Sequence, residues 1–320
     1  MRSLLRQDDI PYIMFRRFKF IYSLYNFFHR KQLSHNIPVY KKLGLRKRYY
    51  SPISSKDFRA VDLNIISDIR AADVQTTLLF KNVDEASQQS ILDYDKNGFI
   101  ILRNYLSDEK VASINNEIDS LLQAKKISFG YGNKLMFAIK HSELLRSVGD
   151  DETFVEFISS LLHGNAALFQ SINFIMGSEQ HTHSDSIHMT TFPLGGLLGV
   201  WIALEDIDDD NGPLHYYPGS HKLPYYLNAD YENEGSYLML GKKDYTEYEE
   251  MLEKKIKELG IEKKVFKAKK GDVLIWHANL LHGGEPHLNK AKARKSMVLH
   301  YFDTNCVCYH EITQRPALIR

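Results

Sequence analysis

The sequence predicts a mainly β fold with flanking helices, in the α+β class. Strand patterns dominate residues 167–302, where short apolar runs are separated by turn residues. The 19 Tyr and 17 Phe supply many flat rings, which pack well on pleated sheets. A chain of 320 residues, 43% of them hydrophobic, can bury one sizeable core. We therefore expect one main domain and an appendage.

The appendage is expected to be a basic extension over residues 1–88, with helical and irregular parts. Residues 1–60 carry 14 Lys and Arg against 3 Asp and Glu, whereas the remainder carries 27 against 37. Over residues 13–28, apolar and aromatic positions recur every three or four residues beside Arg16, Arg17 and Lys19, which predicts an amphipathic helix. This helix would either pack on the acidic body or lie in a membrane interface.

The body is expected to span residues 89–310, with a short tail at 311–320. A turn at Asn97-Gly98 precedes a buried strand at 99–102, and helices are expected at 107–123 and 152–162. The later strands are expected at 168–176, 197–204, 214–217, 273–276 and 296–302. A helix rich in Glu and Lys, at 244–259, lies within an inserted, lid-like segment at 222–265.

Cysteine content and hydropathy indicate the compartment. The two cysteines, Cys306 and Cys308, are separated by one residue, which disfavours a strain-free bridge between them and fits a reducing cytoplasm. No signal-peptide pattern opens the chain, and no apolar run approaches the roughly 18 residues that cross a bilayer. We expect a cytoplasmic protein, with residues 13–28 as a candidate peripheral contact with a membrane.

A metal-binding constellation is the most informative feature of the body. His183 and Asp185 are two residues apart on an extended segment, so both side chains point to the same side. A Gly-Asp turn at 271–272 leads an apolar strand that delivers His282. Two histidines and one carboxylate on one face of a metal leave open positions, the arrangement of non-haem iron(II) oxygenases. His181 and His188 flank the pair, but alternation favours His183; His277 is expected to be a packing residue.

Arg294 is the candidate partner for an anionic co-substrate. It stands twelve residues after His282, at the start of a strand, where a guanidinium can pair bidentately with a carboxylate. A surface Arg at a strand end is the plain alternative. Nucleic acid is not expected as a partner, because the positive charge is confined to the N-terminal part and no known nucleic-acid-binding motif accompanies it.

These stretches together resemble the phytanoyl-CoA dioxygenase family. The resemblance covers about residues 90–305 and is carried by Asp-x-x-Gly-Phe-Ile-Ile-Leu-Arg at 95–103, His183-x-Asp185, the block from Val200 to His221, Lys270-Gly-Asp, His282-Gly and Arg294-Lys-Ser. The block from Trp201 through Asn211-Gly-Pro-Leu to Pro218-Gly-Ser-His221 is the most specific.

The resemblance implies a double-stranded β-helix of the jelly-roll, cupin-like type, with Fe(II), 2-oxoglutarate and O₂. It implies His183, Asp185 and His282 as the catalytic metal ligands. Further cofactor-binding candidates are Arg294, Trp201, Gln170, Asn173, Lys134 and Ser296, and candidates on the substrate side are His188, Thr190 and Thr191. The family commonly has eleven residues from the distal His to the Arg, and this chain has twelve. Lys295 is the competing anchor if the loop does not absorb the extra residue.

The expected activity is hydroxylation of an unactivated carbon, with succinate and CO₂ as co-products. The substrate is expected to be a small molecule or lipid-linked, and the sequence does not identify it. Desaturation, cyclisation or epimerisation by the same oxidant is the nearest alternative. A catalytically silent jelly-roll binding protein is the alternative outside the enzyme class. The sequence does not indicate an oligomeric state.

Overall fold

Antiparallel sheets form the body of the molecule in the computed structural model, which describes residues 15–61 and 73–319. The strands of these described residues are β1 (Phe99–Leu102), β2 (Leu135–Met136), β3 (Ala166–Phe174), β4 (Thr190–Phe192), β5 (Leu197–Ala203), β6 (Leu214–Tyr216), β7 (Lys264–Phe266), β8 (Val273–His277), β9 (His282–Gly284), β10 (Ser296–Asp303), β11 (Val307–His310) and β12 (Arg315–Pro316). The largest sheet has the order β1-β8-β5-β10-β3-β2, and two smaller sheets have the orders β7-β6-β9 and β12-β11-β4.

The largest sheet is covered on both faces, which explains why its central strands are buried throughout. Along β5, Val200 and Ile202 belong to the core shared with the helices, whereas Trp201 and Ala203 belong to the core shared with β6 and β7. Alternate side chains of a strand point to opposite faces, so one apolar run supplies both cores. The interior between the sheets is where the candidate site lies.

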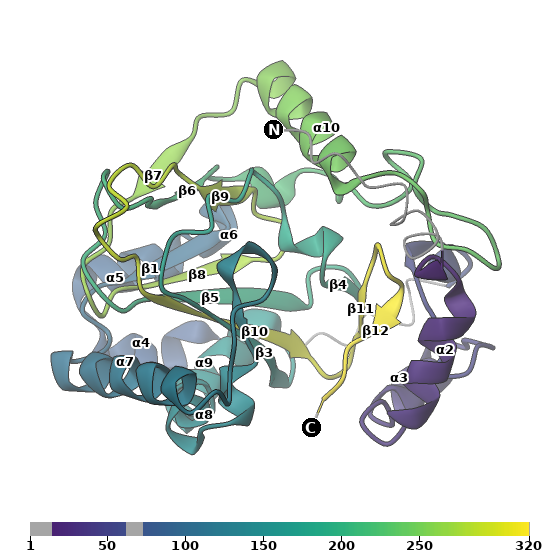
Figure 1. The fold of residues 1–320 in the computed structure, drawn as a ribbon, viewed down its shortest axis with the longest axis horizontal. Coiled ribbons are helices and arrows are strands. Elements are labelled where there is room, and N and C mark those ends of the chain that lie inside the picture. Colours follow the sequence, from purple (N-terminus) through teal and green to yellow (C-terminus); the bar gives the residue numbers. More distant parts are fainter. Residues whose placement is uncertain (1–14, 62–72, 320) are drawn as a thin grey trace.

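The described helices surround the sheets. They are α2 (Lys19–Phe28), α3 (Asn36–Lys42), α4 (Leu78–Asn82), α5 (Glu85–Leu92), α6 (Tyr94–Asn97), α7 (Asp108–Gln123), α8 (Glu143–Gly149), α9 (Glu152–Leu162) and α10 (Tyr245–Leu259). In Figure 1, α4, α7, α8 and α9 lie beneath the largest sheet, whereas α10 lies on the opposite side of the molecule. Leu79 of α4 belongs to the same apolar core as this sheet.

The predicted fold class is confirmed, and most predicted elements occur within about three residues of their expected bounds. The strand at 99–102 and the helix at 152–162 have the predicted limits, and Gly98 adopts the left-handed conformation of the expected turn, with φ +80°. The helical shell contributes more residues than the sheets, 35% against 20%. Cys306 and Cys308 are both buried and free.

The predicted helix at 13–28 is too long where the structure describes it. Regular helix begins at Lys19, and Phe18 instead forms a β-bridge with Met239 of the inserted segment. Arg17 donates hydrogen bonds to the carbonyls of Leu240 and Gly241. These contacts tie residues 17 and 18 to the inserted segment, and Phe18 itself is extended, with φ −74° and ψ 120°. Ile13 and Met14 lie outside the described residues.

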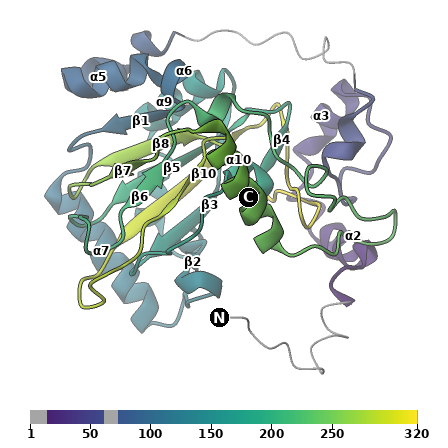
Figure 2. The same cartoon turned by 90° about the horizontal axis from the view of Figure 1, so that it is seen from above.

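The N-terminal segment attaches to the body through its second helix. Val39, Tyr40 and Leu43 of α3 share a small apolar core with Val307 and Tyr309 of β11. Figures 1 and 2 show α2 and α3 at one edge of the molecule, beside the small sheet that contains β11. Among the described helices, none is long and apolar enough to cross a membrane.

The inserted segment between β6 and β7 carries α10. Its first turn is closed by a capping box of Asp244 and Glu247, and it ends at Gly260 in the left-handed conformation. Tyr248 and Leu252 are fully buried against Ile187 and Leu281, so the apolar stripe of this helix faces the body. The segment thereby covers the stretch that contains His183 and Asp185.

Candidate metal centre

Three side chains that could serve as metal ligands converge in the interior between the sheets. His282 begins β9, and its backbone pairs with that of His183 through two N–H···O bonds of 2.9 Å. Asp185 follows at the start of a short 3₁₀ turn, and its Oδ1 lies 3.9 Å from His183 Nε2 and 3.8 Å from His282 Nε2. All three side chains are buried, and their ligand atoms lie within 4.8 Å of one another. The predicted convergence of these residues is therefore present in the fold.

Backbone carbonyls orient both imidazoles. Nδ1 of His183 lies 2.9 Å from the carbonyl of His181, and Nδ1 of His282 lies 2.9 Å from the carbonyl of Leu280. A carbonyl only accepts, so each Nδ1 carries the proton and each Nε2 presents its lone pair to the centre. Burial lowers the pKa of His183 well below its usual value, which keeps this ring neutral.

Trp276 orients the carboxylate. Its indole Nε1 donates to Asp185 Oδ2 at 2.7 Å, which turns Oδ1 toward the two histidines. Burial alone would raise the pKa of Asp185, but the nearby His282, His300 and His183 outweigh it and hold the pKa below its usual value. An ionised carboxylate oxygen and two imidazole lone pairs facing one point are a donor set that suits iron(II).

His300 is a buried neighbour of the centre that sequence reasoning missed. It lies on β10, and its Nε2 is 3.5 Å from Asp185 Oδ2. Neither ring nitrogen has a hydrogen-bond partner among the described residues. Alternation along the strand could have indicated it, because Arg294, Val298 and His300 are separated by even numbers of residues and all line one cavity.

A cavity of about 520 Å³ contains the three ligand-type residues. Its inner wall includes Trp201, Phe174 and Arg294, and its outer wall includes Lys134, Lys140, Phe137, Phe169 and Arg315. Asp185 supplies the one carboxylate among the described lining residues, against four Lys and Arg. The cavity is therefore suited to anionic ligands.

Arg294 is buried inside this cavity with part of its guanidinium uncommitted. Nε donates to the carbonyl of Gly212 at 3.1 Å and Nη1 to Ser296 Oγ at 3.3 Å, whereas Nη2 has no partner among the described residues. Burial lowers its pKa to about 10, so it stays charged at neutral pH. Lys295 points away and forms an ion pair of 3.1 Å with Asp119 of α7. The fold thus brings Arg294, and not Lys295, to the cavity.

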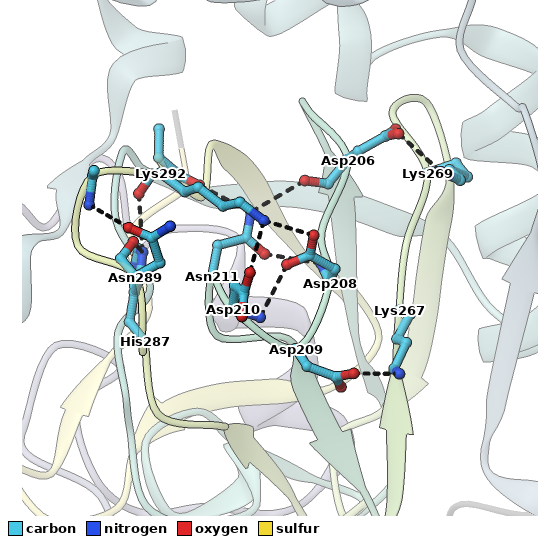
Figure 3. A network of polar contacts seen from close by, with 12 residues as sticks. Asp206, Asp208, Asp209, Asp210, Asn211, Lys267, Lys269, His287, Asn289 and Lys292 are labelled. Atoms are coloured by element: carbon cyan, nitrogen blue, oxygen red, sulfur yellow. Dashed lines mark hydrogen bonds and ion pairs between the residues drawn. The ribbon is translucent and has the colours of Figure 1, made fainter.

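A polar network fixes the loop that carries Gly212 (Figure 3). Asn211 donates from its amide to the carbonyls of Asp206 and Ala293 and accepts from the backbone of Asp208. Lys292 pairs with Asp208 and Asp210 at 2.9 and 3.1 Å. The network joins loop 206–212 to the residues just before Arg294. It therefore fixes the position of the Gly212 carbonyl relative to the Arg294 side chain.

The other predicted site residues divide into two groups. Gln170, Trp201, Lys134 and His188 line the cavity. Asn173 lies between the lining residues Ile172 and Phe174 and faces the opposite side of the sheet, so the structure does not bring it to the cavity. Ser296 contacts only the guanidinium of Arg294 among the candidate groups.

Thr190 and Thr191 do not line the cavity either. The hydroxyl of Thr190 donates to the carbonyl of Ser186, and that of Thr191 accepts from the backbone of Gly196 at 3.0 Å. Both hydroxyls therefore hold the local backbone rather than face a substrate. His188 alone of the three substrate-side candidates reaches the cavity, where its Nε2 lies 3.0 Å from Tyr245 Oη.

Distant segments complete the cavity wall. Tyr25 and Asn26 of α2 and Arg315 of β12 are lining residues, and Asn26 is buried with an amide nitrogen that lacks a partner among the described residues. Gln180 links the metal centre to the outer wall of the cavity. Its Oε1 accepts a hydrogen bond from Lys134 at 3.0 Å, and its Nε2 lies 3.1 Å from His183 Nε2. No local sequence pattern signals these contacts, because they depend on tertiary packing.

Comparison with known proteins extends this description. The phytanoyl-CoA dioxygenase family model matches residues 94–296. The chain is 24% identical over 241 residues to the peroxisomal phytanoyl-CoA dioxygenase of Bos taurus, covering 67% of each protein. It is 30% identical over 147 residues to the ectoine dioxygenase of Stutzerimonas stutzeri, covering 40% of this chain and 48% of that protein.

Solved structures share the fold. The non-heme alpha-ketoglutarate-dependent carbocyclase SnoK from nogalamycin biosynthesis superposes with a TM-score of 0.58 at 17% identity, over 71% of this chain and 87% of SnoK. EctD from S. alaskensis, solved with 2-oxoglutarate and 5-hydroxyectoine, superposes with a TM-score of 0.53 at 21% identity, over 73% of this chain and 82% of EctD.

Proposed function

The chain belongs to the phytanoyl-CoA dioxygenase family and is a 2-oxoglutarate-dependent dioxygenase with iron as its metal; on this premise we propose that it hydroxylates an unactivated carbon. The proposed substrate is a small molecule or lipid-linked, and the proposed co-products are succinate and CO₂. The observation that supports this reading best is the convergence of His183, Asp185 and His282 at one end of a cavity that also contains the buried Arg294.

The residues have separate tasks in this proposal. His183, Asp185 and His282 would hold the iron, and a set of three protein ligands would leave the metal accessible to a 2-oxo acid and O₂. When bound, iron(II) and 2-oxoglutarate together supply the oxidising power, because reduction of O₂ is coupled to decarboxylation of the 2-oxo acid. Trp276 keeps the carboxylate of Asp185 turned toward the iron position through its 2.7 Å hydrogen bond.

Arg294 is proposed to bind the distal carboxylate of 2-oxoglutarate. Its free Nη2 is buried, and its Cζ lies 5.2 Å from the ring centre of Trp201 and 6.0 Å from that of Phe174. These rings exclude water from the guanidinium, which strengthens an ion pair formed there. Gly212 and Ser296 fix the guanidinium before the co-substrate arrives, so little ordering is left to be done on binding.

The outer part of the cavity suggests the class of substrate. Met136, Phe137, Phe169 and Met189 offer an apolar surface, and Lys134, Lys140 and Arg315 add positive charge. We propose a substrate with an apolar chain or ring and one anionic group. The apolar part would place its C–H bond near the metal centre, while the anionic group would meet the cations of the outer wall.

Turnover assays test this function. Iron-loaded protein would receive 2-oxoglutarate, O₂ and a panel of aliphatic carboxylic acids and alkyl phosphates, each paired with the uncharged alcohol of the same chain. We expect anionic members to raise succinate release above the substrate-free rate and to gain one oxygen atom by mass spectrometry. Loss of two hydrogens would indicate desaturation. If no panel member raises succinate release although iron and 2-oxoglutarate are bound, the result would favour a catalytically silent binding protein.

A further inference from the structure

The N-terminal helix α2 turns its apolar side to solvent. Phe20, Leu24, Phe27 and Phe28 follow i, i+4, i+7, i+8 spacing and are between 41% and 71% exposed. The polar stripe of the same helix faces the body, since Lys19 and Asn26 are only 9% and 1% exposed. An amphipathic helix that packed on the body by its apolar face would have the opposite orientation. Of the residues that packing by the apolar face would bury, Phe15 and Tyr25 are exposed and Phe18 and Tyr22 are half-buried, so α2 contacts the body mainly by its polar stripe.

The exposed side chains form one continuous patch. The ring of Phe15 packs edge-on against that of Phe20 at 6.3 Å, and Phe27 contacts both Phe28 and Tyr50, with ring centres 5.8 and 5.9 Å apart. We call Phe15, Phe20, Leu24, Phe27 and Phe28 the α2 patch. A contiguous apolar patch on a protein surface marks an interaction site, because such area is costly to leave in water.

Positively charged side chains lie at and beside the α2 patch. The guanidinium carbon of Arg30 lies 4.5 Å from the ring centre of Phe27, and that of Arg48 lies 6.0 Å from the ring centre of Tyr50. Over residues 15–60 the chain has 12 Lys and Arg against one acidic residue, Asp57. Aromatic rings interleaved with Arg and Lys are the composition of helices that lie in the headgroup region of anionic membranes.

The α2 patch adjoins the opening of the catalytic cavity. Tyr25 lies on α2 between Leu24 and Phe27, and its side chain is 44% exposed. Both Tyr25 and the neighbouring Asn26 line the cavity. Leu318 lines the same cavity. A surface on which the patch rests would therefore lie next to the route into the cavity.

We infer that the α2 patch docks on an anionic lipid surface and that the cavity receives its substrate from that surface. The rings and Leu24 would enter the boundary between headgroups and acyl chains, while Arg30, Lys31 and Arg48 would contact lipid phosphates. The docking itself is independent of the proposed reaction, and only the lipid origin of the substrate rests on it. A lipid with an anionic headgroup matches both the apolar and the cationic parts of the cavity wall.

Vesicle co-sedimentation tests the docking without any turnover. Full-length protein would be mixed at low salt with vesicles of phosphatidylcholine alone or with added phosphatidylglycerol. We expect binding to the anionic vesicles, loss of binding as salt screens the charges, and at least about tenfold weaker partitioning for F20S/L24S/F27S. The matched control L78S/Y131S/L288S removes three exposed apolar side chains elsewhere and should bind like the unaltered protein.

Three outcomes would overturn the inference. One is no binding to anionic vesicles at low salt, and another is equal binding by F20S/L24S/F27S. The third is a dimer in lipid-free solution that this variant converts to a monomer, since the α2 patch would then be an interface between two copies. Circular dichroism and the basal rate of succinate formation should be unchanged in F20S/L24S/F27S, because these side chains touch neither the core nor the metal centre. Failure to bind vesicles leaves the proposed oxygenase reaction untouched.

Discussion

Arg294 carries a buried positive charge that no carboxylate of the described residues contacts by hydrogen bond or ion pair. Two of its nitrogens are occupied by Gly212 and Ser296, the third has no partner among the described residues, and the side chain lines the cavity. Burying a cation without a partner is costly, and an anionic ligand removes that cost. This is the physical reason for assigning 2-oxoglutarate to this end of the cavity.

Replacing Arg294 by Ala should therefore raise the 2-oxoglutarate concentration needed for half-maximal turnover at least about tenfold, because a charge-assisted bidentate pair contributes about 1.5–3 kcal/mol. Iron binding should remain near normal. Steady-state kinetics and metal titration measure the two effects. K295A is the matched control, since Lys295 pairs with Asp119 outside the cavity. A larger effect in K295A than in R294A would reverse the assignment.

Trp276 makes a second residue-level prediction. W276F keeps an aromatic side chain but removes the hydrogen bond to Asp185 Oδ2, so the carboxylate should lose its fixed orientation and iron affinity should fall by about 10–100-fold. Competition with a metal chelator measures this change. W201F is the control, because the indole N–H of Trp201 has no partner among the described residues. Equal iron affinity in W276F and the unaltered protein would contradict the proposed role.

At the scale of elements, α10 supports the metal centre from outside. Tyr248 is fully buried, and its hydroxyl lies 3.2 Å from Ser184 Oγ and 3.4 Å from the backbone nitrogen of Ser184. Ser184 stands between two proposed ligands, so the inserted helix is tied directly to the motif. The inserted segment is thus part of the site's support and not only a cover.

Removing the Tyr248 hydroxyl should destabilise the protein. Y248F leaves the ring packing intact but leaves the hydroxyl and backbone N–H of Ser184 without this hydrogen-bond partner, which costs about 1–3 kcal/mol. The free energy of unfolding, obtained from urea titration, measures the loss. The exposed Tyr237 supplies the control Y237F, which should change this free energy by less than about 0.5 kcal/mol. Unchanged stability in Y248F would show that α10 is not anchored through this bond.

The elements of the body were predictable because each has a local signature. The apolar runs of β5 and β10 are flanked by turn residues, and Ser107 caps α7 at the predicted start of that helix. The start of α2 was not predictable, since the bridge from Phe18 to Met239 joins residues more than 200 positions apart. Tertiary contact there overrides a good helical pattern.

The residues of the site also divide into those with a local sequence pattern and those that depend on tertiary contacts. His183, Asp185 and His282 follow from spacing and strand placement, and Arg294 follows from its strand position. Asn173 was assigned to the cavity, although alternation from Gln170 places it on the other face. The contributions of Tyr25, Arg315 and Tyr245 could not be found in the sequence, because they meet only after the N-terminus, the tail and the inserted segment pack around one opening.

For the whole molecule, buried histidines predict acid sensitivity. Burial lowers the pKa of His277 to about 4 and that of His310 to about 3, whereas both would titrate near 6.5 in the unfolded chain. The unfolded chain therefore binds more protons below pH 6.5, and the free energy of unfolding should fall from there toward pH 4.

Urea titration at pH 7, 6 and 5 checks this prediction. Each neutral histidine contributes a slope of up to about 1.4 kcal/mol per pH unit in this window. His277 is held neutral by accepting a hydrogen bond at Nδ1 from the backbone of Asn279. H277Q should therefore show a shallower loss of stability than the unaltered protein. An identical slope in H277Q would mean that His277 is protonated in the folded state.

The most direct test of the account is the iron content of single-ligand variants. We expect one iron(II) per chain in the unaltered protein and in H181A and H277A, with 2-oxoglutarate-dependent succinate formation retained. H183A, D185A and H282A should bind iron at least about tenfold more weakly and form no succinate above the iron-free background. Full iron binding in H282A, or loss of iron in H277A with the fold intact, would contradict the placement of the metal among His183, Asp185 and His282.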